Sequence, residues 1–474
     1  MGRIDTVHDG EQEVFSEYGH RYAVLFIVLF AVLMAVIDST VVNIALPSMT
    51  RFFSAELSDT QWTITAYLIT MTSLLLVFGH VSGYVGRARL FLTGIVIFTV
   101  SSLACGLSVN LAELIFFRIL QGAGAAMLFS ISSALIFAST PPAEQGRAMG
   151  YLGSTVAIGG IAGPVLGGFI VDSLGWEYIF FINIPIGLLL IIAALKYLRF
   201  DVRHSEQLEM DWYGSAAMVG VFVSMIFVLG SLAADTTITP VVVIESGVFI
   251  LLLSVFIWYE KRCPAPLLDL SIFSHRAFVL PVICLVIAFA ANFMMAVVGP
   301  FYFEGVLGYR PSQVGLVFLI NPAVMMIVAP IAGTLYDRYP KRNFASLGML
   351  ISTVAFAMLA YCTITVYIFG MLVAFVLFGI GVGLFQSPNN TIIMSALPKE
   401  KLAVASSVAA TARNLGMTLG VSFGSILLSL QLVIAGSPGD VLGADPTLLA
   451  RSISHIMMIS AVLCLVVAIL ALKW

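Results

Sequence analysis

Charged residues are scarce in this sequence. Asp, Glu, Lys and Arg make up 10% of its 474 residues, whereas hydrophobic residues make up 60%. The mean hydropathy of +1.06 lies far above the range of soluble globular proteins, whose cores are too small to hide so much apolar surface. The 22 basic and 25 acidic residues nearly balance, so no basic surface for nucleic acid is expected. The composition predicts an integral membrane protein.

Patterns that bind metals or carry catalysis are also missing. The six histidines and five cysteines show no CxxC or HxxxH spacing, which is the spacing that structural metal sites use. Four of the cysteines fall in apolar runs, so a disulfide framework is not expected either. No GxxxxGK[ST] loop occurs to hold the phosphates of ATP, and no nucleophile and base pair up in the apolar runs. We therefore expect no metal, no cofactor and no enzyme activity.

Long apolar runs dominate the chain after a polar, acidic start. The first twenty residues lack the positive charge of a signal peptide, so the first apolar run is expected to remain as a membrane span. Each span needs about 20 apolar residues to cross a hydrocarbon core of about 30 Å. Fourteen runs meet this requirement. They begin near Tyr22, Thr60, Leu90, Leu111, Ala148, Tyr178, Tyr213, Pro240, Ala277, Ser312, Phe344, Val366, Leu402 and Ser452.

Basic residues are distributed very unequally between the two sides of these spans. With the N-terminus inside, only Arg51, Arg310 and Arg451 fall in outer loops, and Arg118 and Arg413 fall within spans. All other Lys and Arg residues then lie on the inner side, as the positive-inside rule requires. We therefore predict a multi-pass protein of the cell membrane whose N- and C-termini are both cytoplasmic.

Two predicted cytoplasmic loops resemble each other. The loop after the second span runs from Gly79 to Arg89 and includes Gly86 and Arg87, and the loop after the tenth span includes Gly333, Asp337 and Arg338. Such repeats are typical of transporters built from two six-helix halves. We predict an N-terminal six-helix bundle (1–198), an inserted helical pair with its linkers (199–276) and a C-terminal six-helix bundle (277–474). The sequence does not determine the oligomeric state, although we favour a monomer.

Asp38 is the carboxylate that lies deepest in a predicted span. The run from Tyr22 to Ile37 is apolar, which places Asp38 about 24 Å from the cytoplasmic edge. An unpaired charged carboxylate there costs several kcal/mol, so we expect Asp38 to face an aqueous cavity and to take up and release protons near neutral pH. The alternative is a structural aspartate that is hydrogen-bonded to neighbouring helices.

Two arginines also lie within predicted spans. Arg118 lies about 10 Å from the outer surface and Asp38 about 6 Å, so the two can pair, and protonation of the acid would release the arginine. This pair has the properties of a coupling switch, or else it is a permanent ion pair that compensates a buried charge. Arg413 is a candidate for a similar role in the other half; the alternative is that it reaches a helix carbonyl group.

Small and amide residues mark two further spans. Gly163, Pro164, Gly167 and Gly168 in the fifth span predict a close approach of another helix and a bend, which could seal or hinge the cavity. Asn389 and Asn390 in the twelfth span are candidates to line the cavity, or to form hydrogen bonds between helices.

Four local patterns carry a resemblance to a known family. The stretch from Leu33 to Pro47, with Asp38 and Asn43, is similar to a first-helix signature, and Arg118-Ile-Leu-Gln121-Gly122-Ala-Gly124-Ala-Ala126 is similar to an RxxQGxGaA element. Gly163-Pro164-Val-Leu-Gly167-Gly168 matches the GPxxGG element of exporters, and Trp176 to Gly187 resembles a sixth-helix entry. On these residues the chain resembles the fourteen-helix drug:proton antiporters of the major facilitator superfamily.

The resemblance implies a secondary transporter that exports amphipathic, often cationic compounds in exchange for protons. Asp38 and Arg118 would serve proton coupling; Asn43, Gln121 and the residues of the fifth and twelfth spans would line or gate the cavity. Gly83 stands where the family's loop pattern has an acid that latches the halves together. The alternatives are an exporter of a single metabolite and, from a different class, a membrane pore or a receptor that transports nothing.

Overall fold

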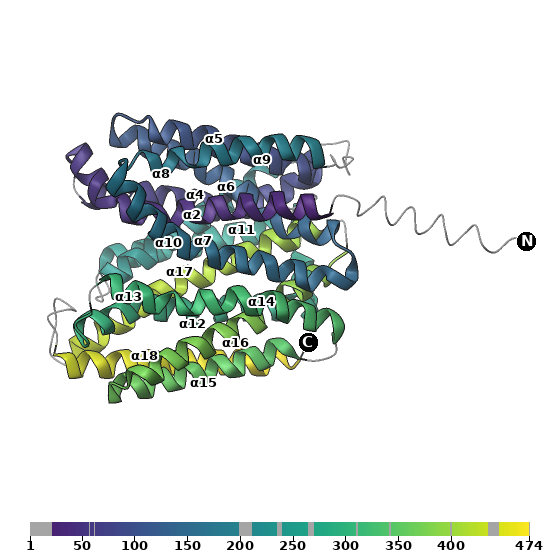
Figure 1. Cartoon of the computed structure of the whole chain (residues 1–474). Helices are drawn as coiled ribbons and strands as arrows, with labels where there is room; N and C mark the ends of the chain where they lie inside the picture. Colours follow the sequence, from purple (N-terminus) through teal and green to yellow (C-terminus); the bar gives the residue numbers. More distant parts are fainter. Residues whose placement is uncertain are drawn as a thin grey trace, which may run out of the picture.

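Every regular element in the described part of the chain is a helix, as the computed structural model shows (Figure 1). Thirteen helical segments there are long and apolar enough to cross a membrane, and a shorter apolar stretch covers Tyr213–Met225 of a further helix. The predicted all-α membrane fold is thereby confirmed. The described residues are 21–55, 57–60, 62–198, 211–234, 239–263, 270–309, 311–340, 343–398, 401–434 and 445–473.

The first group of helices, drawn from purple to blue in Figure 1, contains six spans. α8 and α9 together form the sixth of them. The bounds are α2 Arg21–Phe53, α3 Leu57–Thr60, α4 Trp62–Val85, α5 Arg87–Gly106, α6 Leu111–Ser139, α7 Gln145–Ser173, α8 Tyr178–Phe181 and α9 Asn183–Tyr197.

The second group, drawn from green to yellow, lies beside the first, and α13 and α14 together form one of its spans. Its bounds are α12 Arg276–Gly305, α13 Pro311–Phe318, α14 Ile320–Arg338, α15 Phe344–Thr365, α16 Ile368–Ser395, α17 Leu402–Ile434 and α18 Pro446–Ala471.

Matching stripes of glycine hold α7 against α2 and α17 against α12. A Cβ atom added to Gly167 of α7 would lie 2.6 Å from Cγ2 of Val41, and one added to Gly420 of α17 would overlap the carbonyl oxygen of Ala290. Such close approach requires residues without side chains. The same contact in both groups supports the predicted parallel repeat. The stripes are Gly159, Gly163 and Gly167 in α7, and Gly416, Gly420 and Gly424 in α17.

The two groups meet at the end of the bundle that the sequence predicts to be cytoplasmic. There α7 packs on α14 and α4 packs on α17. A Cβ atom on Gly150 would lie 2.5 Å from the carbonyl oxygen of Ala329, and one on Gly79 would overlap Ser407. Towards the opposite end of α7, Phe169 is 74% exposed. The described structure is therefore closed at the predicted cytoplasmic end.

The last span begins earlier than the sequence pattern predicts, at Pro446 rather than near Ser452. Asp445 caps the helix, and Pro446 follows at a position where its missing N–H group is not needed. The hydroxyl group of Thr447 and the backbone N–H groups of Leu448 and Thr447 donate to Asp445 and hold the pKa of its carboxyl group below the usual value. The hydropathy pattern missed this polar first turn.

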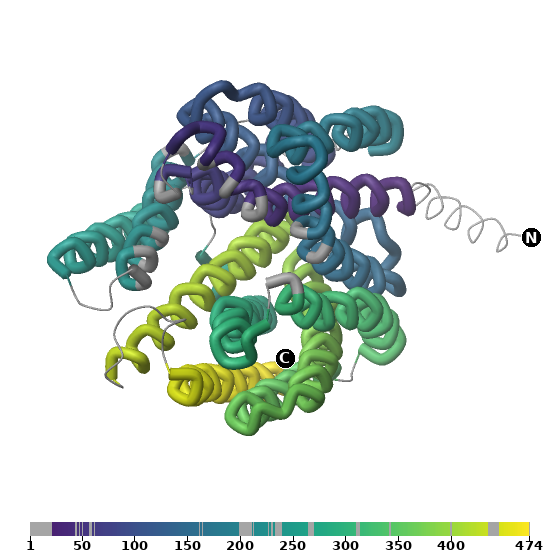
Figure 2. Tube along the Cα trace, turned by 60° about the vertical axis from the view of Figure 1, so that its left-hand side comes forward, coloured from purple at the N-terminus to yellow at the C-terminus, as the bar shows by residue number. Residues whose placement is uncertain are grey.

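The inserted pair consists of α10 (Trp212–Ala234) and α11 (Pro240–Glu260), which pack on each other at the flank of the bundle (Figure 2). α10 contacts both α4 and α17, one from each group. Large apolar side chains of α11 remain exposed, for example Ile244 at 66% and Leu251 at 62%. Such a surface suits lipid and not water.

Candidate functional site

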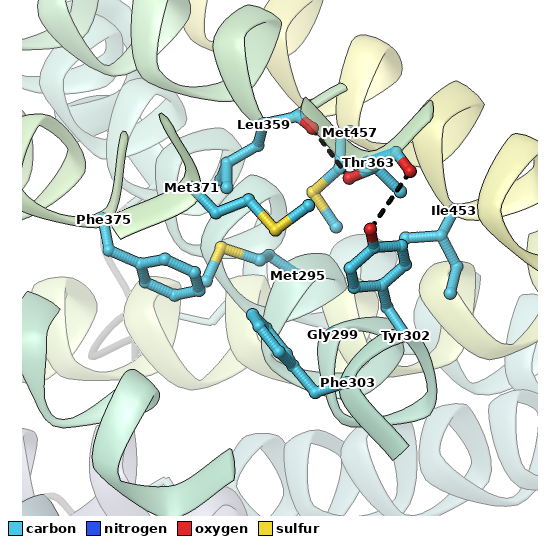
Figure 3. A pocket seen from close by; sticks show the side chains of 10 residues that line it. All are labelled: Met295, Gly299, Tyr302, Phe303, Leu359, Thr363, Met371, Phe375, Ile453 and Met457. Carbon is cyan, nitrogen blue, oxygen red and sulfur yellow. Dashed lines mark hydrogen bonds between the residues drawn. The ribbon is translucent and has the colours of Figure 1, made fainter. Parts of the chain in front are cut away.

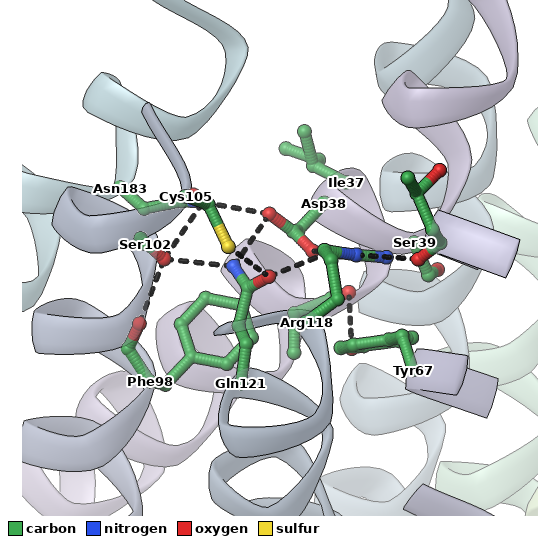
Figure 4. Close-up of polar contacts among 12 residues, drawn as sticks. Ile37, Asp38, Ser39, Tyr67, Phe98, Ser102, Cys105, Arg118, Gln121 and Asn183 are labelled. Carbon is green, nitrogen blue, oxygen red and sulfur yellow. Dashed lines mark hydrogen bonds and ion pairs between the residues drawn. The ribbon is translucent and has the colours of Figure 1, made fainter. Parts of the chain in front are cut away.

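Asp38 lies on α2 and forms an ion pair with Arg118 of α6 (Figure 4). Nη1 of Arg118 lies 2.6 Å from Oδ2 of Asp38, and neither side chain is exposed at all. The structure thus brings together the two charges that the sequence places at similar depth. Removal of one partner from such a buried pair typically costs about 3–5 kcal/mol, because the other charge is left uncompensated.

The other carboxylate oxygen of Asp38 accepts hydrogen bonds from two amides. Nε2 of Gln121 and Nδ2 of Asn183 each lie 2.9 Å from Oδ1. The same two nitrogens also donate to Oγ of Ser102, at 2.8 and 3.4 Å. Together with Arg118, three side chains donate hydrogen bonds to the carboxylate of Asp38.

Arg118 is held on several sides but keeps one nitrogen without a partner. Its Nε donates to the backbone carbonyl of Thr63 at 2.9 Å, and its Nη1 also donates to Oε1 of Gln121 at 2.6 Å. The guanidinium lies 4.1 Å above the ring of Tyr67. Nη2 is buried without a hydrogen-bond partner among the described residues. Arg118 can therefore bind a further acceptor if Asp38 is neutralised.

The expectation that Asp38 faces an aqueous cavity does not hold in this state of the protein. Asp38 is enclosed within the N-terminal bundle. The physical reason is that Gln121 and Asn183 supply the hydrogen bonds that water would otherwise supply. Solvent can therefore reach Asp38 only if this hydrogen-bond network opens.

Sequence reasoning did not assign Asn183, Ser102 or Tyr67 to the site. Asn183 lies at the start of α9, within a motif that identified the family but not the role of this residue. Ser102 is one of many hydroxyl groups in apolar spans, and Tyr67 is one of several aromatic residues that the sequence suggests for an adaptable apolar pocket, without a link to Asp38 or Arg118. The contact between Asn183 and Asp38 joins residues 145 positions apart, so only the packing of α9 beside α2 and α5 reveals it.

The C-terminal bundle has apolar side chains at the corresponding place (Figure 3). Gly122 of α6 packs closely on α4, and Gly379 of α16 packs in the same way on α14, so the two glycines occupy corresponding places. One turn before them along the helices lie Arg118 and Phe375, respectively. Phe375 borders a cavity of about 20 Å³ whose lining is almost entirely apolar. Among the described residues, the pair of Asp38 and Arg118 therefore has no charged counterpart at this place in the C-terminal bundle. The cavity is lined by Met295, Gly299, Tyr302, Phe303, Leu359, Thr363, Met371, Phe375, Ile453 and Met457.

The glycines predicted to pack closely in α7 do so at two positions. A Cβ atom on Gly163 would overlap the hydroxyl group of Thr40, and Gly167 lies against Val41. Gly168, in contrast, has nothing within 4 Å of an added Cβ atom, so the close-packing prediction is wrong at that position. Two further candidates, Asn43 and Pro164, lie in α2 and α7, but their side chains are outside the described part of the structure.

Replacing Gly167 with Leu should lower transport and its coupling to protons, because the added side chain pushes α7 away from α2. Overpacking of this kind costs about 1–3 kcal/mol, so expression should remain near normal. Gly168→Leu is the matched control, since open space surrounds that residue. The measurement is pH-driven efflux from cells that contain equal amounts of each variant. Equal efflux in the two variants would show that the packing is dispensable.

Asp337 links the two bundles at the predicted cytoplasmic end. Its two carboxylate oxygens accept from the backbone N–H groups of Gly146 and Arg147, at 2.8 and 3.0 Å. These groups lie in the first turn of α7, where the helix dipole favours a negative charge. Gly333 lies so close to Gly146 that a Cβ atom would overlap its carbonyl group. Gly333 and Asp337 thus lie in the last turns of α14 and not in the predicted loop, and we call the contact of Asp337 with α7 the latch.

The corresponding segment of the first repeat lacks the acid and has Gly83 in its place. An added Cβ atom at Gly83 would meet nothing within 4 Å. Gly86 adopts a φ of 94°, which favours glycine, and it directly precedes α5. Arg87 is the first residue of that helix, and Arg338 lies 5.6 Å from the ring of Tyr339. Asp337 therefore has no acidic counterpart at Gly83, although Gly79 of the same segment packs against Ser407 of α17.

Asp337→Asn should loosen the closed end, because the negative charge at the start of α7 is lost. A cysteine placed at Ser387, which donates to the carbonyl of Gly146 at 2.7 Å, reports on the opening. We expect its labelling by a membrane-impermeant maleimide in inside-out vesicles to rise several-fold. Cys263 should first be replaced with Ser, because it alone of the five cysteines is not buried. Asp172→Asn, at an exposed site, is the control; unchanged labelling in Asp337→Asn would contradict the latch.

Asn389 and Asn390 are buried on α16, at 0% and 3% exposure. Neither amide forms a hydrogen bond in the described structure, so the interhelical bonds considered from the sequence are not seen. Asn390 lies one turn after Ser387, on the face of α16 that meets α7. An amide that is buried without a partner is costly, and separation of the bundles would allow Asn390 to form hydrogen bonds.

Comparison with known proteins places the chain in a family. The sequence profile of the Major Facilitator Superfamily matches residues 28–421. "Riboflavin transporter RibZ" of Clostridioides difficile (strain 630) is 31% identical over 419 residues, which cover 87% of this chain and 89% of that protein. "Multidrug export protein EmrB" of Escherichia coli (strain K12) is 31% identical over 389 residues, which cover 81% and 76%.

Solved structures share the fold. The proton:xylose symporter XylE aligns over 96% of both chains with a TM-score of 0.67 and 14% sequence identity. The human organic anion transporter MFSD10 aligns over 94% of this chain and 99% of its own, with a TM-score of 0.64 and 13% identity. At such low identity these two comparisons support the fold alone.

Proposed function

This chain belongs to the major facilitator superfamily, and we propose that it exports amphipathic compounds from the cytoplasm in exchange for protons. The observation that carries the proposal is the buried pair of Asp38 and Arg118 in the N-terminal bundle. An acid so deep in a transporter is most useful where a proton must be bound and released. The relatives named as multidrug export proteins support the direction of transport.

The proposed cycle moves a proton through Asp38. Protonation removes the negative charge, so that Nη1 of Arg118 loses its ionic partner and the guanidinium must find another acceptor. The network that joins α2, α5, α6 and α9 then loosens, and the bundles rock about the substrate. Deprotonation re-forms the pair. The proton thereby biases which end of the bundle is open.

The arrangement of the chain in the membrane is part of the same proposal. We infer that both termini are cytoplasmic, in a cell membrane, and that the bundles divide at 1–198 and 277–474 around the inserted pair. Because α10 contacts both bundles, the inserted pair can stay in contact with both of them as they move. A monomer contains both bundles and therefore suffices for alternating access, with protons and a small molecule as partners.

A narrow substrate range is the second candidate. It is favoured by the relative named as a riboflavin transporter, which is as similar to this chain as the multidrug exporters are. The other class, a pore or a receptor, does not explain the latch at Asp337 or the buried pair of Asp38 and Arg118. Steady electrical conductance through the purified protein in a planar bilayer would favour the pore over the exporter.

Transport into inverted vesicles tests the proposed function. Several chemically unrelated amphipathic dyes should accumulate when the vesicle interior is acidic, and accumulation should stop when the pH gradient is collapsed. Accumulation of one metabolite alone would select the narrow exporter. Accumulation that is equal with and without the gradient would contradict proton coupling.

A further inference from the structure

Arg413 on α17 is a deep arginine without an acidic partner among the described residues. It lies about 16 Å along the helix from Leu402, by the rise of 1.5 Å per residue. Its Nε is buried and forms no hydrogen bond. Its guanidinium carbon lies 5.7 Å from the ring centre of Phe289 on α12. Arg413 therefore differs from Arg118, which has an ion pair and several hydrogen bonds.

Arg413 combines a buried guanidinium nitrogen with a partly accessible side chain. Its Nε is buried, whereas the side chain as a whole keeps a partly accessible surface. The glycines at 416 and 420 bring α17 against α12, which places Arg413 beside the aromatic residues of α12.

Two of those aromatic residues form a wall next to the guanidinium. The rings of Phe289 and Phe293 are stacked, with their centres 6.5 Å apart and their planes 19° from parallel. Both rings are partly accessible. A flat aromatic compound can pack on such a wall, and a group at its edge can then reach Arg413.

The charges buried deep in the bundle indicate which chemical group of the ligand would bind to Arg413. In the described long helices, three charged residues lie about two turns or more from both helix ends. They are Asp38, Arg118 and Arg413. Asp38 and Arg118 neutralise each other. The remaining charge is positive, and in a medium of low dielectric constant it repels a cation and attracts an anion.

We propose that Arg413, with Phe289 and Phe293, is the subsite that recognises the substrate, and that it takes an aromatic ring bearing an anionic group such as a carboxylate or a phenolate. This inference rests on the proposed export function and narrows its substrates to one charge class. The guanidinium binds the anionic group through charge-assisted hydrogen bonds, and the stacked rings hold the aromatic plane.

Binding of two xanthene dyes of opposite charge to the purified protein tests the proposal. Fluorescence anisotropy should show that anionic fluorescein binds at least tenfold more tightly than cationic rhodamine 123. Arg413→Gln should weaken fluorescein binding by about tenfold or more, which is the usual contribution of a hydrogen bond to a charged group. Rhodamine binding should not weaken. Arg413→Lys keeps the charge and should retain part of the affinity for fluorescein.

Arg451→Gln, at an exposed position on α18, is the matched control and should bind both dyes as the wild type does. Rhodamine binding as tight as that of fluorescein would overturn the proposal, as would unchanged fluorescein binding in both Arg413→Gln and Arg413→Lys. Binding is measured without a pH gradient. The dye affinities therefore test the subsite even in a protein that fails to couple export to protons.

Discussion

Asp38→Asn should abolish pH-driven efflux. The substitution keeps the size of the side chain and its capacity for hydrogen bonds, but it removes the group that binds the proton. The structure adds a second consequence. The charge of Arg118 loses its partner in a site with no exposure, so the single variant should also lose about 3–5 kcal/mol of stability. The measurement is efflux at a fixed pH gradient, with protein amounts compared in the same membranes.

The double variant Asp38→Asn, Arg118→Gln separates coupling from stability. It removes both charges, so that neither is left buried alone, and its thermal stability should recover towards that of the wild type. Its pH-driven efflux should remain absent. Efflux at the wild-type rate in either variant would mean that Asp38 is structural and that protons couple elsewhere.

Gly333→Leu should abolish transport by holding the predicted cytoplasmic end open. A Cβ atom at Gly333 would overlap the carbonyl group of Gly146, so a leucine there cannot coexist with the closed contact of α14 on α7. Neither helix can yield without breaking the hydrogen bonds from Gly146 and Arg147 to Asp337. We expect at least a tenfold loss of efflux, while dye binding from the cytoplasmic side persists.

The cysteine at Ser387 again reports the state of the bundle. In Gly333→Leu its labelling from the cytoplasmic side should reach a maximum that no substrate or pH gradient lowers. Gly315→Leu on α13 is the control, because nothing lies within 4 Å of an added Cβ atom there. Labelling at the wild-type level, together with normal efflux, would show that the bundles do not need the contact of Gly146 with Gly333.

The fold could be predicted from the sequence because the membrane leaves few choices. Apolar runs of sufficient length must be helices, since lipid offers no partner for unpaired backbone groups. Most helix starts therefore match to within a few residues. The start of α18 does not, because its first turn is polar and is fixed by the cap at Asp445, which a hydropathy pattern does not register.

The site could be predicted only in part. The depth of Asp38 and Arg118 follows from counting residues along helices, and it sufficed to pair them. The roles of Asn183 and Ser102 depend on which helix faces lie side by side, and helix periodicity alone does not determine the neighbours of a face. The same limit explains the glycines of α7, since Gly167 meets α2 whereas the adjacent Gly168 faces open space. Close packing is a property of the contact and not of the residue.

Proton release on substrate addition tests the central claim most directly. The purified protein is placed in a weakly buffered solution with a pH indicator, and a dye that the vesicles accumulate is added. Because the substrate and the proton exclude each other in an exchanger, the wild type should release protons when the dye binds, and Asp38→Asn should bind the dye and release none. Proton release from Asp38→Asn equal to that of the wild type would contradict the assignment of Asp38 as the coupling site.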